Sequence, residues 1–264
     1  MEEFKITDLT PDNIADYGVC GYKDAKKHPE LQKKIDWFAK YYPMGLRIKV
    51  ISSGKGEYKG MIEYIPGEYA HRPVDAQGYL FIHCIFMGFR KEDKGQGYGT
   101  ALIEACIREA EAAGMDGVAV VTRKGSFMAT DDIFSKLGFE VVDTAEPDFH
   151  LMVKKCRDSA KNPAFRKEMT KSLEQYREGL TILRSPQCPY TEKNVNAIMQ
   201  TARDEFHMAA NLIELADARA VQNAPNPFGT FCIIYNGKII SHHPVSNTRF
   251  ENIMREMIGN KKEK

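Results

Sequence analysis

The apolar run GYLFIHCIFM (residues 78–87) and the glycine-rich stretch KGQGYGTALIEAC (residues 94–106) decide the fold class of this chain. The run is rich in β-forming residues, which is typical of a central strand covered on both faces. In the second stretch, a glycine turn opens a helix that ends at Gly114. The apolar face of this helix consists of Ala101, Leu102, Ala105, Cys106 and Ala112. A strand, a tight turn and a helix in this order predict an α/β (α+β) fold.

Strands and helices alternate on both sides of this stretch. Before it, the spacing of Leu31, Ile35 and Phe38 predicts a helical region over residues 11–42. Apolar β-prone runs predict strands at residues 4–9, 46–52, 59–65, 117–123, 139–143 and 149–155. A short helix is expected at residues 131–138. These elements together predict one domain over residues 1–155.

A second, smaller domain is expected at residues 180–264. The charged connector at residues 156–179 is poor in β-formers and contains Pro163, which indicates a partly helical linker. Beyond it we expect strands at residues 180–185 and 211–215, and helices at residues 191–206 and 248–257. The Asn236-Gly237 pair predicts the turn of a β-hairpin over residues 230–241. The predicted order is therefore β-α-β-β-β-α.

Composition and charge bound the classes of function. The chain has 264 residues, 37 basic and 36 acidic side chains, and a net charge of +1. Such a balance gives no broad field for nucleic acid or an anionic membrane, so neither is expected as a partner. The first residues lack the features of a secretory signal, and no run approaches a membrane span, so we expect a cytoplasmic protein. The six cysteines form no C-x-x-C pair, which predicts free thiols and no metal site.

The turn at residues 94–99 is the first candidate binding site. It follows a strand and opens a helix, where backbone N–H groups converge on an anion and glycine lets the backbone approach it closely. Any tight strand-to-helix turn also uses glycine, so the signal is not specific by itself. A dinucleotide-binding interpretation fails, because no acidic residue ends a second parallel strand about 20 residues further on.

The turn resembles motif A of the GNAT acetyltransferases, R/Q-x-x-G-x-G/A, with Lys94 in place of the usual Arg or Gln. The later Leu137-Gly-Phe139 is similar to a second signature of that family, and the resemblance covers about residues 4–155. It implies a GNAT fold with a mixed, centrally splayed sheet and acetyl-CoA as the acetyl donor. It also implies that Lys94 and the amides of the turn hold the coenzyme A pyrophosphate, and that the strand edge at Met87 and Phe89 pairs with the pantetheine arm. The amides are those of Gly95, Gln96, Gly97, Tyr98, Gly99 and Thr100.

The same resemblance assigns the proton-transfer groups. In GNAT enzymes with a base on a strand, the base lies eleven residues before the motif, which is His83 here. His83 as a hydrogen-bonded core residue is the alternative, and both interpretations stay open. The family's general acid is a Tyr, and Phe134 stands at that position. Candidates for a substitute donor are Ser126, Tyr98 and Thr122.

The loop before the central strand is the candidate acceptor site. In GNAT folds the corresponding region borders the acceptor, so the resemblance implies that Glu68, Tyr69 and Arg72 bind substrate. A solvated hairpin loop is the alternative for any one of these residues.

Cys188 is the second candidate catalytic residue. It precedes a helix, where free N–H groups favour a thiolate. Cys188-Pro-Tyr-Thr191 resembles the C-P-Y-C site of glutaredoxins without its second cysteine, and Gly229 stands where thioredoxin-like folds have a cis-proline. A dithiol cycle is thus excluded, whereas monothiol exchange and a purely docking or dimerising scaffold stay open.

The whole chain resembles GNAT proteins with a C-terminal YoaP-like (thioredoxin-like) domain. This implies an N-acetyltransferase in which an amine of a small molecule or peptide attacks acetyl-CoA directly in a ternary complex. The alternative from another class is a CoA- or thiol-binding redox sensor, or a monothiol glutaredoxin-like protein, that acts through Cys188. Association into a homodimer is left open.

Overall fold

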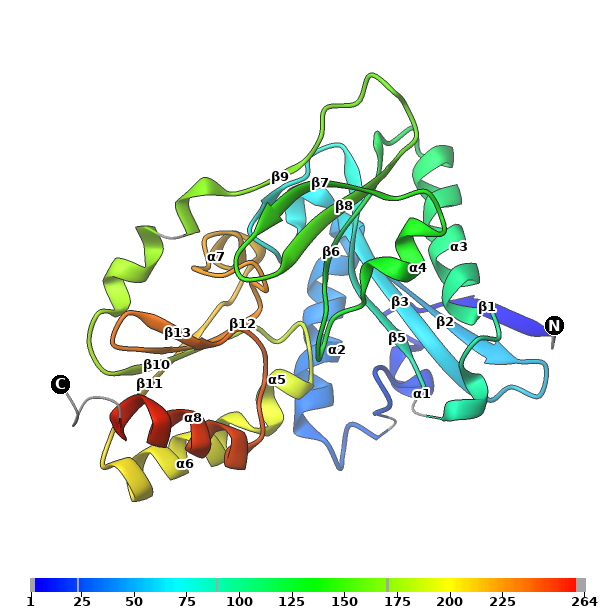
Figure 1. Ribbon diagram of the computed structural model, residues 1–264. Helices are drawn as coiled ribbons and strands as arrows, with labels where there is room; N and C mark the ends of the chain where they lie inside the picture. Colours follow the sequence, from blue (N-terminus) through cyan, green and yellow to red (C-terminus); the bar gives the residue numbers. More distant parts are fainter. Residues whose placement is uncertain (1–2, 23, 89, 170, 260–264) are drawn as a thin grey trace. The chain divides into compact units, whose positions relative to one another are not determined.

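The computed structural model describes residues 3–22, 24–88, 90–169 and 171–259, and the chain divides into two compact units (Figure 1). The first unit contains the chain up to Ala70 and from Val74 to Arg166. The second contains His71–Pro73 and the chain from Lys167 onward. The three residues His71–Pro73 therefore belong to another unit than the residues on either side of them.

The first unit is built on a mixed seven-stranded sheet with the strand order β1-β2-β3-β5-β6-β8-β7. Within this sheet only the central pair, β5 and β6, runs parallel, and the other pairs are antiparallel. The strands are β1 (Phe4–Asp8), β2 (Arg47–Ser53), β3 (Tyr58–Pro66), β5 (Tyr79–Met87), β6 (Gly117–Arg123), β7 (Glu140–Ala145) and β8 (Phe149–Lys155). A mixed α/β fold is thus confirmed.

Helices cover both faces of this sheet. Helices α3 (Tyr98–Ala112) and α4 (Asp131–Ser135) pack on the face that carries Ile62 and Val120. Helix α2 (Pro29–Tyr41) contacts Glu63, the neighbour of Ile62 on β3. Because successive side chains of a strand point to opposite faces, α2 covers the other face of the sheet.

The helical region predicted over residues 11–42 is interrupted. Helix α1 (Ile14–Tyr17) ends at Gly18, and Gly18, Cys20 and Gly21 have positive φ angles of 69°, 53° and 86°. A left-handed backbone conformation cannot continue a right-handed helix, so α2 begins only at Pro29. The buried face of α2 also differs from the prediction: it includes Lys34 and Trp37, while Ile35 is half-buried.

The second unit has a four-stranded sheet in the order β11-β10-β12-β13. Strands β10 (Leu180–Arg184) and β11 (Ala210–Glu214) are parallel, and β12 (Phe231–Tyr235) and β13 (Lys238–Ser241) are antiparallel to their neighbours. The predicted hairpin turn is confirmed, with φ angles of 48° at Asn236 and 75° at Gly237.

The helices of the second unit are α5 (Tyr190–Lys193), α6 (Val195–Phe206), α7 (Ala218–Gln222) and α8 (Asn247–Gly259). Helices α6 and α8 lie side by side, and Thr201 donates a hydrogen bond to Asn247 at 2.7 Å between them (Figure 1). Helix α7 was absent from the sequence prediction. It spans only five residues and is capped by Asp217, whose carboxylate accepts a bond from the Ala220 amide at 2.8 Å.

The predicted linker, residues 156–179, contains a short strand and two 3₁₀ helices. Strand β9 (Ala164–Phe165) pairs with β4 (Val74–Asp75) in the first unit. The 3₁₀ helices η4 (Lys167–Met169) and η5 (Lys171–Tyr176) follow in the second. None of the helices in the described ranges is both long and apolar enough to cross a bilayer.

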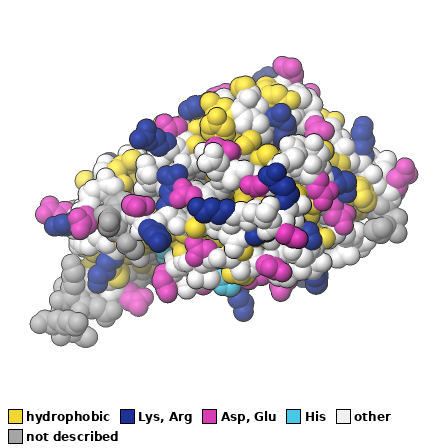
Figure 2. Space-filling view, turned by 90° about the horizontal axis from the view of Figure 1, so that it is seen from above, with side chains coloured by type: hydrophobic (Ala, Val, Ile, Leu, Met, Phe, Trp, Pro, Cys, Tyr) yellow, Lys and Arg dark blue, Asp and Glu magenta, His cyan; other side chains and the backbone are white. Residues whose placement is uncertain are grey.

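Basic and acidic side chains are interspersed on the face of the molecule that Figure 2 shows. This mixture agrees with the near-neutral net charge of +1. An anionic ligand would therefore need a local arrangement of donors, because no strong field of one sign covers this face.

Candidate active site

Strands β5 and β6 diverge in the middle of the first sheet. They pair only from Tyr79 with Gly117 to Ile82 with Val120, although β5 continues to Met87 and β6 to Arg123. On its other edge, β5 pairs with β3 as far as Met87. Beyond Ile82, β5 therefore has no ladder pairing with β6.

A small cavity lies where the two strands separate. The side chains around it are mostly apolar, and they come from β5, β6, the loop after β6 and helix α4. The lining residues are Ile82, His83, Cys84, Ile85, Val120, Val121, Phe127, Met128, Ala129 and Phe134. Of the predicted catalytic residues, the structure brings His83 to this cavity.

The glycine turn leads from the end of β5 into α3. Gly95 and Gly97 have φ angles of 75° and 82°, so the turn uses the left-handed conformation that glycine permits. A Cβ atom on Gly95 would meet nothing within 4 Å. A Cβ atom on Gly99 would lie 2.9 Å from the Ile133 side chain, so Gly99 serves the packing of α3 against α4.

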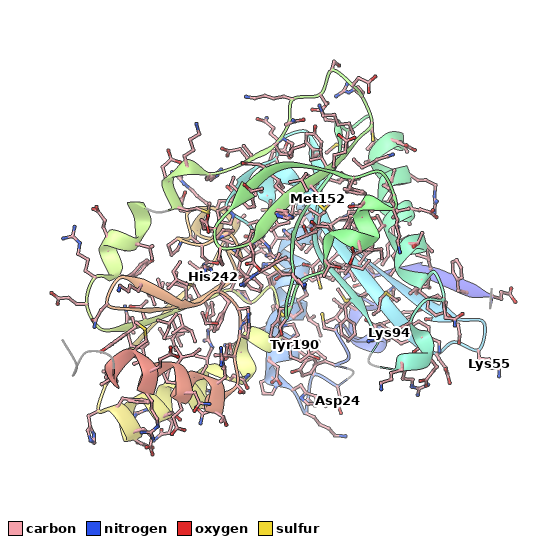
Figure 3. All side chains as sticks on the ribbon, in the orientation of Figure 1. Asp24, Lys55, Lys94, Met152, Tyr190 and His242 are labelled. Carbon is pink, nitrogen blue, oxygen red and sulfur yellow. The ribbon has the colours of Figure 1, made fainter. Side chains whose placement is uncertain are left out.

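The predicted phosphate-binding residues divide into exposed and buried groups. The residues from Lys94 to Gly97 are exposed, and Lys94 lies beside the beginning of α3 (Figure 3). Tyr98 is 2% exposed and packs edge-on against Phe4 with 6.1 Å between the ring centroids. Its side chain therefore belongs to the core. The first helix bond runs from Ala101 to Gly97, so the amides of Tyr98, Gly99 and Thr100 have no partner within the helix.

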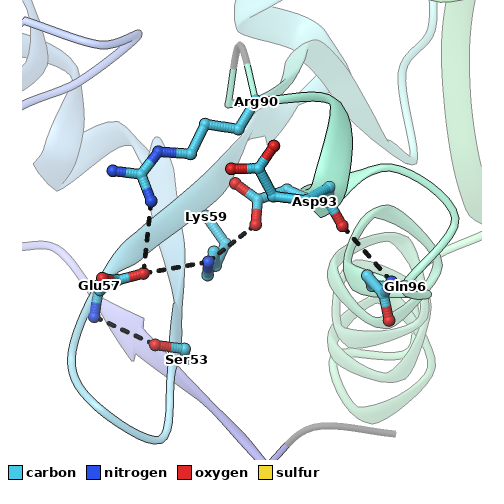
Figure 4. Close-up of polar contacts among 7 residues, drawn as sticks. Ser53, Glu57, Lys59, Arg90, Asp93 and Gln96 are labelled. Atoms are coloured by element: carbon cyan, nitrogen blue, oxygen red, sulfur yellow. Dashed lines mark hydrogen bonds and ion pairs between the residues drawn. The ribbon is translucent and has the colours of Figure 1, made fainter.

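A buried ion pair fixes the segment before the turn, which includes the 3₁₀ helix η3 (Lys91–Asp93). Lys59 on β3 donates a hydrogen bond to Asp93 at 2.7 Å and a second one to Glu57 at 3.2 Å (Figure 4). Arg90 also pairs with Glu57 at 3.6 Å. The Asp93 carboxylate raises the pKa of Lys59, which keeps this pair charged. Sequence reasoning missed Lys59 and Asp93, because they are far apart in the chain.

The strand end next to the turn was predicted to hold the pantetheine arm. Met87 packs against the core, and its Sδ would lie 2.8 Å from a Cβ atom on Gly60, so Gly60 makes room for it. Phe89, the second predicted residue, lies outside the described residues. The binding of pantetheine here stays a prediction.

His83 is the extra residue of a β-bulge on β5. Cys84 pairs with Glu63 and Ile82 pairs with Tyr64, so His83 faces no residue of its own on β3. Bulges re-aim side chains, and this one places the imidazole on the α2 face. The ring is fully buried, and its Nδ1 lies 3.2 Å from Glu63 Oε1. Its centroid is 6.1 Å from that of Trp37.

Glu63 joins His83 to a buried lysine. The other carboxylate oxygen of Glu63 pairs with Lys34 of α2, whose side chain is 1% exposed. The ammonium group of Lys34 lies 4.1 Å from the Trp37 ring centroid. Burial alone would raise the pKa of Glu63, but Lys34 and His83 lower it to about 2. The three groups therefore form a charge-compensated cluster, defined here as the Lys34–Glu63–His83 cluster.

Both interpretations of His83 stay compatible with this geometry. The imidazole is a hydrogen-bonded core group, and it also lines the cavity between β5 and β6. Its catalytic role stays a prediction. Lys34 and Glu63 were missed, although a glutamate inside the apolar run KGMIEYI (residues 59–65) was a signal that could have found one of them.

A second His–carboxylate pair lies at the start of α4. Asp131 accepts a hydrogen bond from the Thr122 hydroxyl, and its other oxygen lies 2.7 Å from His150 Nδ1. Burial raises the pKa of Asp131, and the bonds with Thr122 and His150 lower it further than burial raises it. These three residues are defined here as the Thr122–Asp131–His150 cluster.

The side chains considered as substitutes for the missing tyrosine have other contacts or lie outside the cavity between β5 and β6. Phe134 is fully buried and packs on Phe139 with 5.2 Å between the centroids. Tyr98 lies in the core, and the Thr122 hydroxyl donates to Asp131. Ser126 lies on an exposed loop.

The predicted substrate-binding residues fall into both units. Glu68 and Tyr69 belong to the 3₁₀ helix η2 (Gly67–Tyr69) of the first unit, and Tyr69 is 41% exposed. Arg72 belongs to the second unit and is only 4% exposed. Its guanidinium carbon lies 5.3 Å from the Phe228 ring centroid. Their binding of substrate stays a prediction.

Cys188 lies in the second unit, and it is therefore not in the same unit as His83. It is partly exposed and precedes the short helix α5. Thr191 stands where glutaredoxins have their second cysteine. Its hydroxyl lies within hydrogen-bond distance of two carbonyl oxygens, that of Cys188 at 2.7 Å and that of Ser185 at 2.9 Å, so it stabilises the turn. In the described part of the chain, no group of three or more His, Cys, Asp and Glu residues is arranged to hold a metal ion.

The chain is similar in sequence to known proteins. The sequence model of a family described as YoaP-like matches residues 210–252. A curated Bacillus subtilis (strain 168) protein, YoaP, described as an uncharacterized N-acetyltransferase, is 27% identical over 253 residues. The match covers 95% of this chain and 98% of that protein.

Several solved acetyltransferase structures are similar to part of the chain. Escherichia coli YhbS, a GNAT family N-acetyltransferase in complex with CoA, is 11% identical, with 63% of this chain and 92% of that chain covered and a TM-score of 0.41. The spermidine/spermine N-acetyltransferase SpeG from Vibrio cholerae is 13% identical, with coverage of 58% and 95% and a TM-score of 0.40. The chain is therefore similar over nearly its full length to a protein described as an N-acetyltransferase, and its residues 210–252 match the YoaP-like family model.

Proposed function

We propose that this protein is an acetyl-CoA-dependent N-acetyltransferase, which transfers the acetyl group to an amine by direct attack in a ternary complex. One observation carries the proposal: β5 stops pairing with β6 beyond Ile82, and the chain that follows β5 and η3 forms an exposed glycine turn at the N-terminus of α3. An edge suits an extended amide-containing arm, and a helix N-terminus suits a diphosphate. The nearly full-length similarity to an N-acetyltransferase supports the same chemistry.

The residues of the turn fit the donor. Gly95 and Gly97 leave the backbone accessible. The amides of Tyr98, Gly99 and Thr100 lie in the first turn of a helix of 15 residues, at the positive end of its dipole. Lys94 and Gln96 are exposed beside them. When bound, acetyl-CoA supplies the activated thioester. The chain supplies anion-binding amides at one end and the backbone edge of β5 at the other.

His83 is the proposed general base. The bond between its Nδ1 and Glu63 would fix the ring, and Nε2 is the nitrogen proposed to accept the proton that the amine loses. Lys34 compensates the charge of Glu63, so the carboxylate is held ionised in a buried place. The acceptor is a small molecule or a peptide amine, and the loop with Glu68 and Tyr69 is the proposed recognition element.

The second unit is proposed to have a thioredoxin-like fold. The order β11-β10-β12-β13, with one parallel pair and helices before and after, supports this assignment. We propose a catalytic domain at residues 1–155, a linker at 156–179 and a second domain at 180–264. A thiol function through Cys188 is not favoured, because the nearly full-length relative is described as an N-acetyltransferase.

A calorimetric titration with acetyl-CoA tests the proposal. Gly95→Glu adds bulk and negative charge to the turn, and Gly114→Glu is its matched control. Both glycines have positive φ angles, of 75° and 63°, and both face open space. We expect acetyl-CoA to bind the wild type and Gly114→Glu but not Gly95→Glu. Binding would justify an acceptor screen that follows CoA release, whereas a wild type that does not bind acetyl-CoA would overturn the proposal.

A further inference from the structure

The segment His71–Pro73 belongs to the second unit, although Ala70 and Val74 on either side belong to the first. An ordinary solvent-exposed loop would not divide in this way. His71 is fully buried and Arg72 is 4% exposed. Loop tips are normally exposed and polar. A buried His-Arg-Pro sequence therefore requires other residues that pack around it.

The contacts of Arg72 identify some of these packing residues. Its guanidinium carbon lies 5.3 Å from the Phe228 ring centroid, in the range of a cation–π contact. Its Nη1 also donates a hydrogen bond to the His71 carbonyl oxygen at 2.7 Å. Burial of an arginine is costly unless its donors are satisfied, so the position is specified by the surrounding groups.

Gly229 shows how closely the two backbones approach. A Cβ atom on Gly229 would lie 3.1 Å from Arg72 Cα and 3.1 Å from Pro73 Cδ. Its φ angle of 73° also favours glycine. The Gly229 amide donates to the Asn226 carbonyl oxygen at 3.0 Å, which closes a tight turn. A side chain at residue 229 would crowd the segment, and it would crowd Val221 as well, whose Cγ1 would also lie 3.1 Å from a Cβ atom there.

We propose that the turn of residues 226–230 is a clasp that binds the chain's own segment His71–Pro73. The clasp consists of the tight turn, the Phe228 ring under Arg72 and the bare backbone of Gly229. By holding three residues, it restrains the loop from Gly67 to Val74, which includes Glu68 and Tyr69. The restraint acts through the peptide bonds that join the segment to Ala70 and Val74, and it does not depend on the acetyl-transfer proposal.

Hydrogen exchange followed by mass spectrometry on the full chain tests the clasp. Gly229→Val fills the space that the segment occupies, and Gly179→Val is the matched control. Gly179 lies in the same unit with a φ angle of 74°, but a Cβ atom there would meet nothing within 4 Å. Both variants carry the same backbone strain. We expect the amides of residues 68–72 to exchange at least about tenfold faster in Gly229→Val alone.

A second variant keeps the test decisive if Gly229→Val disturbs the second unit as a whole, which faster exchange in β12 would reveal. Arg72→Ala removes the stacked guanidinium without changing the turn. Arg177→Ala is its control, because the Arg177 side chain is 72% exposed. We expect faster exchange at residues 68–72 in Arg72→Ala and wild-type exchange in Arg177→Ala. Wild-type exchange in Arg72→Ala, or equal exchange in the two glycine variants, would overturn the proposal.

Discussion

Two His–carboxylate pairs lie on opposite faces of the first sheet, and they differ in burial. In the Lys34–Glu63–His83 cluster, the side chains of His83 and Glu63 are fully buried. In the Thr122–Asp131–His150 cluster, the side chains of His150 and Asp131 are 41% and 35% exposed. The buried pair needs a third, compensating charge, whereas water screens the exposed pair. The same residue types should therefore have very different effects on function and stability.

The largest expected effect is on catalysis. With an acceptor found in the CoA-release screen, His83→Ala should lower turnover by about 10²–10⁴-fold, because a positioned general base contributes on that scale. His150→Ala should leave turnover near the wild-type value, since His150 does not line the cavity between β5 and β6. Steady-state rates check this, with calorimetry to establish that both variants bind acetyl-CoA. Equal losses in the two variants would contradict the assignment of His83.

The buried cluster should also dominate stability. Glu63→Leu leaves the Lys34 charge buried without its carboxylate, and should lower the free energy of unfolding by about 3–5 kcal/mol. The double variant Lys34→Met, Glu63→Leu should recover most of this loss, because no unpaired charge remains. Denaturant unfolding of the three proteins measures both effects. A double variant as unstable as the single one would show that packing, and not charge compensation, holds this cluster.

The stability should depend on pH through Glu63. Its pKa is lowered to about 2 in the folded protein from an ordinary value of 4.5. A lowered pKa means that the ionised form stabilises the fold, so this contribution is complete above about pH 4.5 and is lost as the pH falls toward 2. Urea unfolding between pH 6 and pH 3 should show a weaker pH dependence for Glu63→Gln than for wild type. A wild-type slope in Glu63→Gln would assign the acid sensitivity to other groups.

The smallest effect is expected for the exposed pair. His150→Ala should change the free energy of unfolding by about 0.2–1 kcal/mol, as exposed ion pairs usually do. Added salt should reduce the difference from wild type, because exposed charges are screened. Thermal unfolding at low and high ionic strength measures this. A loss as large as that of Glu63→Leu would remove the proposed distinction between the two pairs.

The sequence predicted elements whose signals are local. The apolar run at residues 78–87 is strand β5, the glycine turn opens α3, and Asn236-Gly237 forms the hairpin turn. It failed where the signal was weak or interrupted. Helix α7 has five residues, and residues 18–21 break the helical region by adopting positive φ angles. Such features are too short to show the helical spacing of apolar residues on which the prediction depends.

The sequence predicted the glycine turn of the candidate site, but not the buried charged residues around it. The exposed turn with Lys94 and Gly95 was found, because glycine spacing is visible in a sequence. Lys59 and Asp93, which fix this turn, are separated by 34 residues, and Lys34 and Glu63 by 29. Periodicity does not indicate which distant charges will meet. A lysine on the apolar face of a helix and a glutamate inside an apolar strand were the available signals.

By itself, the sequence determined the α/β class, the glycine turn and the position of His83 on a central strand, because these follow from local backbone preferences and side-chain period. The tertiary structure decided the bulge that aims His83, the carboxylate and the lysine that accompany it, and the burial of Arg72 in the second unit. These features depend on which segments pack together. A buried charge is stable only where packing provides its partner, and that partner is fixed by the whole fold.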